Sequence, residues 1–119
     1  MLTRQEIVAG LANFYGTDTW TSHGLARHIL MTDGVVWLRE AADAYWLIDA
    51  IVSYQGEAKF KAEEFQVWTL TVRDGKGKLT AGDGNDNVLV EQKIAFTDFP
   101  LDEITFYFTG NVIMLPSEY

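Results

Sequence analysis

The sequence contains no cysteine, which excludes disulfides, thiolate metal sites, iron–sulfur clusters and cysteine nucleophiles. None of the three serines, Ser22, Ser53 and Ser117, lies in the Gly-x-Ser-x-Gly pattern of a nucleophile elbow. Residues 1–10 lack the basic region and apolar run of a signal peptide, and no stretch approaches the ~20 apolar residues that cross a bilayer. We therefore expect a cytoplasmic protein without a cofactor, and the residues favour a role other than catalysis.

Basic residues are also scarce. The chain has 9 Lys and Arg against 17 Asp and Glu, and its net charge is −8. The acidic residues are spread along the sequence and no basic arm is present, so direct binding to nucleic acid or to a membrane is not expected. An acidic surface resists aggregation, which explains the sign of the charge without a specific function.

The length and composition indicate a single domain over residues 1–119. A chain of 119 residues has room for one core, and 48% of the residues are hydrophobic, including 4 tryptophans. The apolar pattern changes along the chain. Residues 1–56 are mainly of helical period, whereas residues 63–116 are mainly alternating.

The first half predicts two or three helices. Thr3 and Glu6 have the spacing of a capping box and predict a helix over residues 4–14. Thr32 or Asp33 can begin a second helix. The pattern at residues 41–44 allows either its continuation or a new helix capped by Asp43, with a wide apolar face from Ala44 to Gln55. Between the first and the second of these helices the sequence is rich in turn formers, and residues 28–31 could form a short strand.

The second half predicts an antiparallel meander of about five strands. The expected strands lie near residues 65–72, 79–81, 88–96, 104–109 and 112–115, with turns at 74–77, 83–87 and 110–111. Alternation would place Val88, Val90, Ile94 and Phe96 on one face of their strand. We predict an α+β fold in which the N-terminal helices pack on one face of this C-terminal sheet.

The other face of the sheet is the best candidate for an interaction surface. Alternation gives it a set of aromatic and β-branched residues: Phe65, Val67, Thr69, Thr71, Thr105, Tyr107 and Thr109. This set lacks the dense charge of a fully hydrated sheet face. It could bind a partner protein or a second copy of the chain, or it could be an ordinary exposed Thr-rich face; the pattern favours neither.

The only two histidines, His23 and His28, could form a metal site with Asp33. Their five-residue spacing suits neither one helix face nor one strand face, and two partly exposed loop histidines with ordinary hydrogen bonds are the simpler interpretation. Trp20 and Trp37 bracket the same region. A small-molecule pocket there is the alternative to a binding surface on the sheet.

Two glycine-containing turns resemble ligand-binding loops only superficially. Asp83–Asn87 begins like a calcium loop, but the positions that need Gly and Glu hold Val88 and Ile94. Gly75–Thr80 lacks the spacing of a phosphate-binding loop and leads into a strand. Arg73, Lys76 and Lys78 could contact an anion weakly, although solvated turn residues are the simpler interpretation.

Several segments resemble a family of small bacterial and mobile-element proteins that is known only as a domain of unknown function. They are Thr32-Asp33-Gly34-Val35, Ala44-Tyr45-Trp46-Leu47-Ile48-Asp49, Phe65-Gln66-Val67-Trp68, Thr97-Asp98-Phe99-Pro100-Leu101 and Leu115-Pro116-Ser117-Glu118-Tyr119. They span most of the chain in order, so the resemblance covers the whole domain. It implies no activity and no catalytic residues.

Three hypotheses for function follow from these observations. The first is a protein-binding module, such as an inhibitor or accessory protein of mobile-element origin. The second is a small enzyme or ligand binder with a pocket near Trp20–Trp37. The third is a self-associating structural protein that uses the Thr-rich sheet face.

Overall fold

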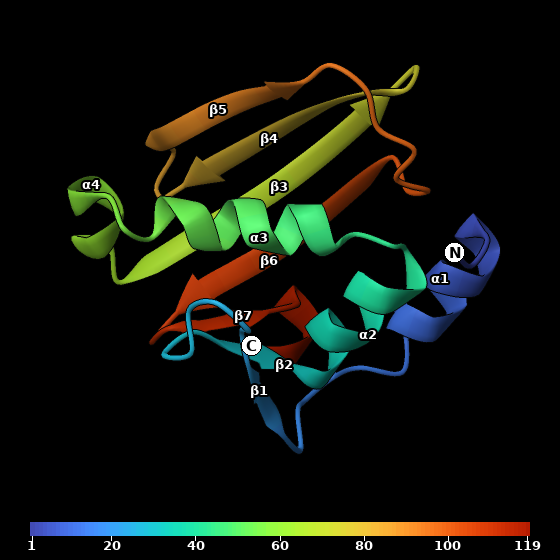
Figure 1. Ribbon diagram of the computed structural model, residues 1–119, viewed down its shortest axis with the longest axis horizontal. Helices are drawn as coiled ribbons and strands as arrows, with labels where there is room; N and C mark the ends of the chain where they lie inside the picture. Colours follow the sequence, from blue (N-terminus) through green and yellow to red (C-terminus); the bar gives the residue numbers. More distant parts are fainter.

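The computed structural model describes all of residues 1–119 and shows helices packed against one face of a single sheet (Figure 1). The helices are α1 (Arg4–Leu11), α2 (Asp33–Ala41), α3 (Tyr45–Tyr54), the short α4 (Ala58–Lys61) and the 3₁₀ turn η1 (Pro116–Glu118). The strands are β1 (Trp20–Ser22), β2 (Leu30–Thr32), β3 (Phe65–Arg73), β4 (Lys76–Gly82), β5 (Val88–Ile94), β6 (Glu103–Thr109) and β7 (Val112–Met114). None of the helices has the length and apolar character needed to cross a membrane.

The seven strands form one mixed sheet in the order β1-β2-β7-β6-β3-β4-β5. The α+β class is confirmed, but the predicted five-stranded antiparallel meander is wrong. β2 pairs with β7 in parallel, and β6 pairs with β3 rather than with β5. The helices are not all N-terminal either, because α4 directly precedes the long strands and η1 follows β7.

After β5 the chain does not turn back to form a neighbouring strand. Residues 95–102 cross the end of the sheet instead. The Thr97 N–H donates to the Gly75 carbonyl at 2.8 Å, which holds this segment beside the β3–β4 turn. The Val72 N–H then donates to the Asp102 carbonyl at 2.8 Å. These two bonds direct the chain to the far side of β3, where β6 begins.

Local signals at the helix ends behave largely as expected. Thr3 and Glu6 form the predicted capping box, although α1 ends at Leu11 and not at residue 14. Hydrogen bonds from Thr3, its backbone N–H first and then its hydroxyl, lower the pKa of Glu6. Asp43 adopts a left-handed conformation (φ 52°) that ends α2, so the helix does not continue. Ala44, not Asp43, occupies the cap position of α3.

The β3–β4 turn is the expected two-residue hairpin, with Asp74 and Gly75 both at positive φ (54° and 74°). A register shift between Ala81 and Gly82 changes the facing of β5. Val88 pairs with Gly82 and Val90 with Ala81. The two valines therefore lie on opposite faces, so the expectation that they share one face is wrong.

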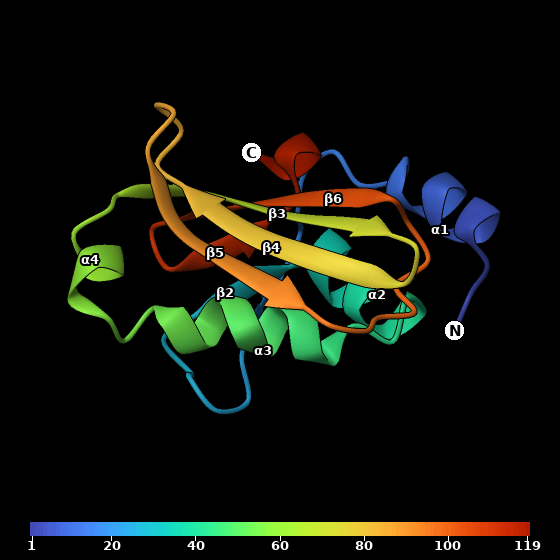
Figure 2. The ribbon, with the colours of Figure 1, turned by 90° about the horizontal axis from the view of Figure 1, so that it is seen from above.

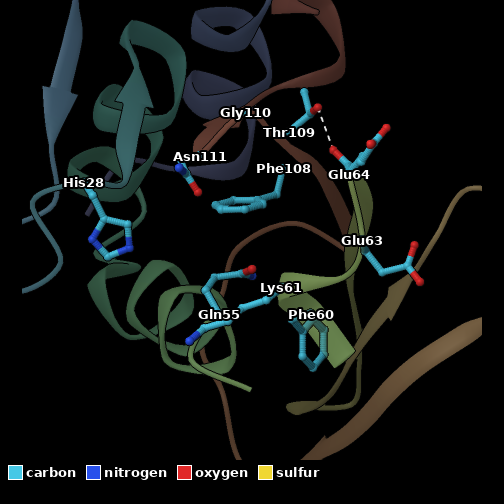
Figure 3. Close-up of a pocket in the computed structure, with 10 residues that line it drawn as sticks. All are labelled: His28, Gln55, Phe60, Lys61, Glu63, Glu64, Phe108, Thr109, Gly110 and Asn111. Carbon is cyan, nitrogen blue, oxygen red and sulfur yellow. Dashed lines mark hydrogen bonds between the residues drawn. The ribbon is translucent and has the colours of Figure 1, made fainter. Parts of the chain in front are cut away.

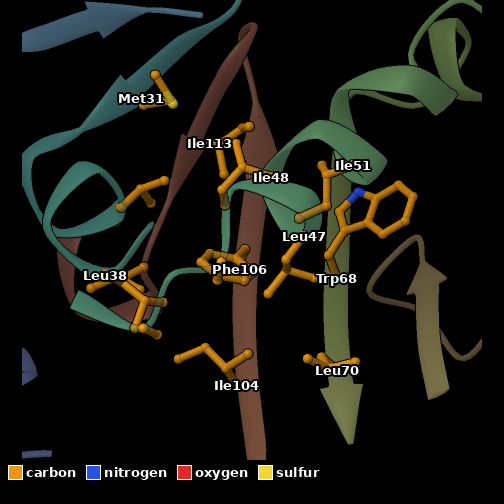
Figure 4. Packing of buried hydrophobic residues seen from close by; sticks show 14 of the residues in the cluster. Met31, Leu38, Leu47, Ile48, Ile51, Trp68, Leu70, Ile104, Phe106 and Ile113 are labelled. Carbon is orange, nitrogen blue, oxygen red and sulfur yellow. The ribbon is translucent and has the colours of Figure 1, made fainter. Parts of the chain in front are cut away.

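The core lies between the sheet and helices α2 and α3 (Figure 4). Alternate residues of β3 and β6, including Trp68, Leu70 and Phe106, are fully buried against Leu38 of α2 and Leu47, Ile48 and Ile51 of α3. Burying a large apolar side chain contributes about 1.5–3 kcal/mol. The apolar residues that recur at helical spacing thus pack directly against those that alternate along the strands.

Candidate interaction face

One face of the sheet is turned away from α2 and α3, and we call it the outer face (Figure 2). The pairing register arranges its residues in rows across the strands, because opposed residues point to the same side. The first two rows are Ser22, Leu30, Val112, Thr109 and Phe65, then Met114, Tyr107, Val67, Gly82 and Val88. The next two are Thr105, Thr69, Thr80 and Glu91, then Glu103, Thr71, Lys78 and Lys93.

Charge on the outer face is confined to one end. The first two rows contain no charged residue, the third contains Glu91 and the fourth contains Glu103, Lys78 and Lys93. We call the first two rows the uncharged half. Charged residues make up 22% of the chain. The ten neighbouring residues of the uncharged half include none, so this half differs in composition from the chain as a whole.

The residues predicted to form an interaction surface are brought together by the fold. Phe65, Val67, Thr69, Thr71, Thr105, Tyr107 and Thr109 all lie on the outer face of the adjacent strands β3 and β6. Most are half-buried by their neighbours, and Thr71 is exposed. The Thr69 and Thr105 hydroxyls lie 3.3 Å apart, and the Thr109 hydroxyl donates to the Glu64 carbonyl at 2.8 Å.

Three aromatic rings form a cluster at the uncharged half: Phe65 and Tyr107 belong to its rows, and Tyr119 packs against both. The ring centroids of Phe65 and Tyr107 are 5.0 Å apart, and the Tyr119 ring lies 5.5 Å from each of them. Tyr119 meets both partners edge to face, at interplanar angles of 73° and 87°. Its side chain is 75% exposed. The cluster therefore presents an aromatic surface to solvent and not only to the core.

The outer face also contains residues that the sequence-based prediction omits. Val112 and Met114 alternate with the buried Ile113, so the pattern of β7 is itself a signal for their outward orientation. Leu30 belongs to the face only through the parallel pairing of β2 with β7. Tyr119 belongs to it because η1 folds back over β6, which no local pattern indicates.

The three candidate metal ligands do not meet. His23 is 4% exposed, and its Nε2 lies 2.7 Å from Asp49 Oδ1 of α3. Its Nδ1 accepts the N–H groups of Leu25 and Ala26, each at 3.2 Å, so we assign the Nε2–H tautomer. His23 is therefore a buried, fully bonded structural residue, and the expectation of a partly exposed loop histidine is wrong for it.

Asp33 ties the preceding loop to the start of α2. Its carboxylate accepts hydrogen bonds from the Thr19 hydroxyl and from the Asp18 N–H at 2.9 Å, while its own N–H donates to the Thr17 hydroxyl at 2.9 Å. The bond from Thr19, followed by that from Asp18, lowers the pKa of Asp33. No group of three or more His, Asp or Glu side chains lies close enough to hold a metal ion.

His28 lies elsewhere, at a polar cavity of about 480 Å³ between β6, the start of β7 and the residues around α4 (Figure 3). Phe108 forms part of its wall, and Gln55, Lys61, Glu63 and Asn111 are among the other lining residues. The Gln55 carboxamide is already bonded to Gln66, with both N···O distances at 2.9 Å. The ionisable residues that line the cavity, which are His28, Lys61, Glu63 and Glu64, form no ion pair with one another.

Trp20 and Trp37 serve different parts of the fold and do not define a common site. Trp37 packs against α1, where its ring centroid lies 5.7 Å from that of Phe14. A Cβ at Gly10 would lie 2.1 Å from the Trp37 ring, so close packing requires glycine there. Trp20 is 54% exposed on β1, an edge strand of the sheet. The pocket predicted near Trp20–Trp37 stays a prediction.

The fold and the outer face define an α+β domain with a two-layer core and one open sheet face. A family of unknown function, DUF6876, has a model that matches residues 5–119. The chain therefore belongs to this family, as its resemblance to a domain of unknown function implied. No match was found among curated proteins or among solved structures, so no activity, ligand or partner is carried over from a characterised relative.

Proposed function

We propose that this protein is a binding module that contacts another protein through the uncharged half of its outer face. The observation that carries the proposal is the absence of charge over two complete rows of an open sheet face. The cores of protein–protein interfaces are depleted of charged residues and enriched in Tyr, Phe and Met. A surface that only had to remain hydrated would not need this composition on a chain of net charge −8.

The aromatic cluster supplies the anchors that such an interface needs. The rings of Phe65, Tyr107 and Tyr119 pack against one another with centroids 5.0–5.5 Å apart, so little side-chain entropy is left to lose on binding. Aromatic residues of this kind carry much of the binding energy in characterised interfaces. The surrounding threonines and Met114 would exclude water from the cluster.

The occupant that we infer is a different protein with an apolar docking surface. Two copies of this chain would each bring a net charge of −8 to the contact, and this repulsion opposes self-association. The two rows of the uncharged half contain no carboxylate for a basic partner to pair with, and Asp86 lies only at their border, in a cavity that Val67 and Val88 also line. The partner should therefore be recognised by apolar contact and by hydrogen bonds to the threonine hydroxyls.

The test compares capture of partners from the native host lysate by the tagged chain and by variants. Tyr107→Asp places a charge in the aromatic cluster. Met114→Asp places a charge directly opposite Tyr107, on the adjacent strand β7. Tyr15→Asp makes the same change at an 83% exposed tyrosine outside the sheet. We expect one stoichiometric protein that is retained by Tyr15→Asp and lost with both sheet variants, while all variants keep a cooperative thermal unfolding transition.

The opposite results would overturn the proposal. Equal capture by wild-type protein and both sheet variants would remove the outer face from consideration. A dimer seen by sedimentation and dissociated by Tyr107→Asp would replace the heterologous partner with a second copy of the chain. Failure to retain any protein under these conditions would also count against a protein-binding module.

A further inference from the structure

Four of the 9 basic side chains gather around one cavity at the opposite end of the sheet from the aromatic cluster. The cavity has a volume of about 680 Å³ and lies where the β3–β4 turn meets the end of β5. Its basic residues are Arg73, Lys76, Lys78 and Lys93. In a chain with 17 acidic residues, this is a local reversal of charge that the rest of the surface does not predict.

The sheet register forces these cations together. Arg73 pairs with Lys76 across the hairpin, and Lys78 pairs with Lys93 across β4 and β5. Directly opposed residues of antiparallel strands have Cβ atoms about 5 Å apart, and like charges in such pairs destabilise a sheet. The hairpin therefore holds two adjacent pairs of positive charges that repel one another.

The surrounding carboxylates neutralise these charges only in part. Lys78 Nζ lies 3.9 Å from Glu91 Oε1, whereas Arg73, Lys76 and Lys93 form no ion pair. Asp74 is the one acidic residue that lines the cavity, and Glu103 lies opposite Thr71 in the same row as Lys78. A bound anion would relieve the repulsion that the protein itself leaves in place.

The cavity also offers apolar surface. Ala95 lines it, and the alkyl stems of Lys78 and Lys93 on the outer face present further carbon surface below their charged ends. The Ile94 side chain points to the other face of the sheet, because Ile94 pairs with the buried Gly77. Its volume lies within the usual range of small-molecule sites, about 300–1,000 Å³. A ligand with an anionic group and a compact apolar body would match both parts.

We propose that this cavity binds a small organic anion, with a phosphate group held by Lys78, Lys93 and Arg73 and an apolar body over Ala95 and the alkyl stems of these side chains. Nucleic acid is a poorer match, because the cations occupy only one end of the outer face and a longer polyanion would meet Glu91 and Glu103. The site is separate from the uncharged half and does not depend on the partner proposed for that surface.

The test is an NMR titration of the full ¹⁵N-labelled chain with phenyl phosphate, and in parallel with inorganic phosphate and a short single-stranded oligonucleotide. We expect saturable shifts confined to the amides of residues 71–78 and 93–95. Phenyl phosphate should bind more tightly than inorganic phosphate, because only phenyl phosphate also contacts Ala95 and the alkyl stems of the lysine side chains.

Matched charge reversals identify the cause of binding. Lys93→Glu should weaken phenyl phosphate binding about tenfold or more, because one charge-assisted contact is lost and a repulsive one is introduced. Lys61→Glu changes the net charge equally at an exposed lysine near α4 and should alter the affinity less than about twofold. Lys76→Glu, at the exposed hairpin tip, provides a second variant if Lys93→Glu perturbs β5.

Three outcomes would overturn the proposal. One is the absence of a saturable shift with phenyl phosphate. Another is an equal loss of affinity in Lys61→Glu, which would show that only the overall charge matters. The third is tighter binding of the oligonucleotide, with shifts that extend along the outer face, because the surface would then be one for nucleic acid.

Discussion

The Glu118 carboxylate accepts a hydrogen bond from the Gly34 N–H at 2.9 Å and so joins η1 to the first turn of α2 across 84 residues. The same carboxylate accepts bonds from the Thr32 hydroxyl at 2.6 Å and from the Leu115 N–H at 3.1 Å. Thr32 occupies the cap position of α2, but its own side chain does not cap the helix. Glu118 therefore supplies the negative charge and the acceptor that a helix N-terminus favours.

Replacing Glu118 by alanine should destabilise the protein by about 1–3 kcal/mol, because three donors lose a charged acceptor. Urea unfolding followed by tryptophan fluorescence measures this change as a lower midpoint. Ser117→Ala, at the exposed neighbouring residue, is the matched control and should stay within about 0.5 kcal/mol of wild type. Equal midpoints for the two variants would show that Glu118 does not act as the cap of α2.

Gly34 is needed where α2 meets η1, since any larger side chain would collide with it. A Cβ there would lie 2.6 Å from Leu115 Cδ1 and 2.7 Å from Glu118 Oε1. We expect Gly34→Ala to cost about 1–3 kcal/mol through this overpacking, despite the better helix propensity of alanine. Gly56→Ala, with no heavy atom within 4 Å of the added Cβ, should cause no such loss in the same denaturation experiment.

These contacts show which parts of the fold a sequence can reveal. The Thr3–Glu6 capping box and the Asp74-Gly75 turn are predictable because each depends on residues within a few positions of one another. The family resemblance includes both Thr32–Val35 and Leu115–Tyr119 but does not indicate that these segments touch. The parallel pairing of β2 with β7 escapes prediction for the same reason, because it joins residues about 80 positions apart.

The outer face is predictable in part, for a comparable reason. The two-residue period of β-strands is enough to place Phe65, Val67 and Tyr107 on one side of the sheet. The same period fails at Val88, where the register shift after Ala81 reverses the facing. Tyr119 cannot be assigned in this way, because its place in the aromatic cluster depends on how η1 folds back.

His23 provides a test in which tertiary structure reverses the sequence-based expectation for a loop histidine. Loss of its bonds to Asp49 and to two backbone N–H groups should make His23→Ala less stable by about 1–3 kcal/mol. His28→Ala, at an exposed histidine in the same loop, should change the stability by less than about 0.5 kcal/mol. Thermal unfolding followed by circular dichroism gives the Tm of each variant. Equal Tm values for His23→Ala and His28→Ala would mean that His23 does not fix the loop.

Asp33 should make the stability depend on pH in the acidic range. Its pKa is lowered in the folded protein, chiefly by the Thr19 hydroxyl and then by the Asp18 N–H. A lowered pKa stabilises the fold above the unfolded-state value of about 3.9, and this contribution is lost as the pH falls through the folded-state value.

The corresponding experiment compares Asp33→Asn with wild type from pH 7 down to pH 2. The substituted carboxamide cannot carry the charge that the donors of Thr19 and Asp18 stabilise, so the variant should melt at a lower temperature at pH 7. The difference in Tm should shrink as the pH falls below about 4, because the carboxylate of the unfolded chain is protonated there and that of the folded protein only at a lower pH. A difference that is constant with pH would indicate a contribution from packing and not from the charge of Asp33.

The buried carboxamide of Gln66 offers a prediction about the core. Gln66 is fully buried, accepts the Trp68 indole N–H at 2.8 Å, donates to the Phe60 carbonyl at 3.2 Å and pairs with Gln55. Gln66→Met keeps the shape but leaves these groups without a partner, so we expect a loss of about 2–4 kcal/mol. Gln92→Met, at the half-buried acceptor of the Tyr54 hydroxyl, should cost only about 0.5–1.5 kcal/mol because water can replace that bond.

A double-mutant cycle separates the hydrogen bond from the packing. Trp68→Phe removes the indole donor together with part of the ring volume, and this single change has its own cavity cost. If the indole N–H is costly to leave unpaired, Gln66→Met should be less destabilising in the Trp68→Phe background, with a coupling of about 0.5–3 kcal/mol. Strict additivity of the two changes would show that the Trp68–Gln66 bond contributes nothing to stability beyond the shapes of the two side chains.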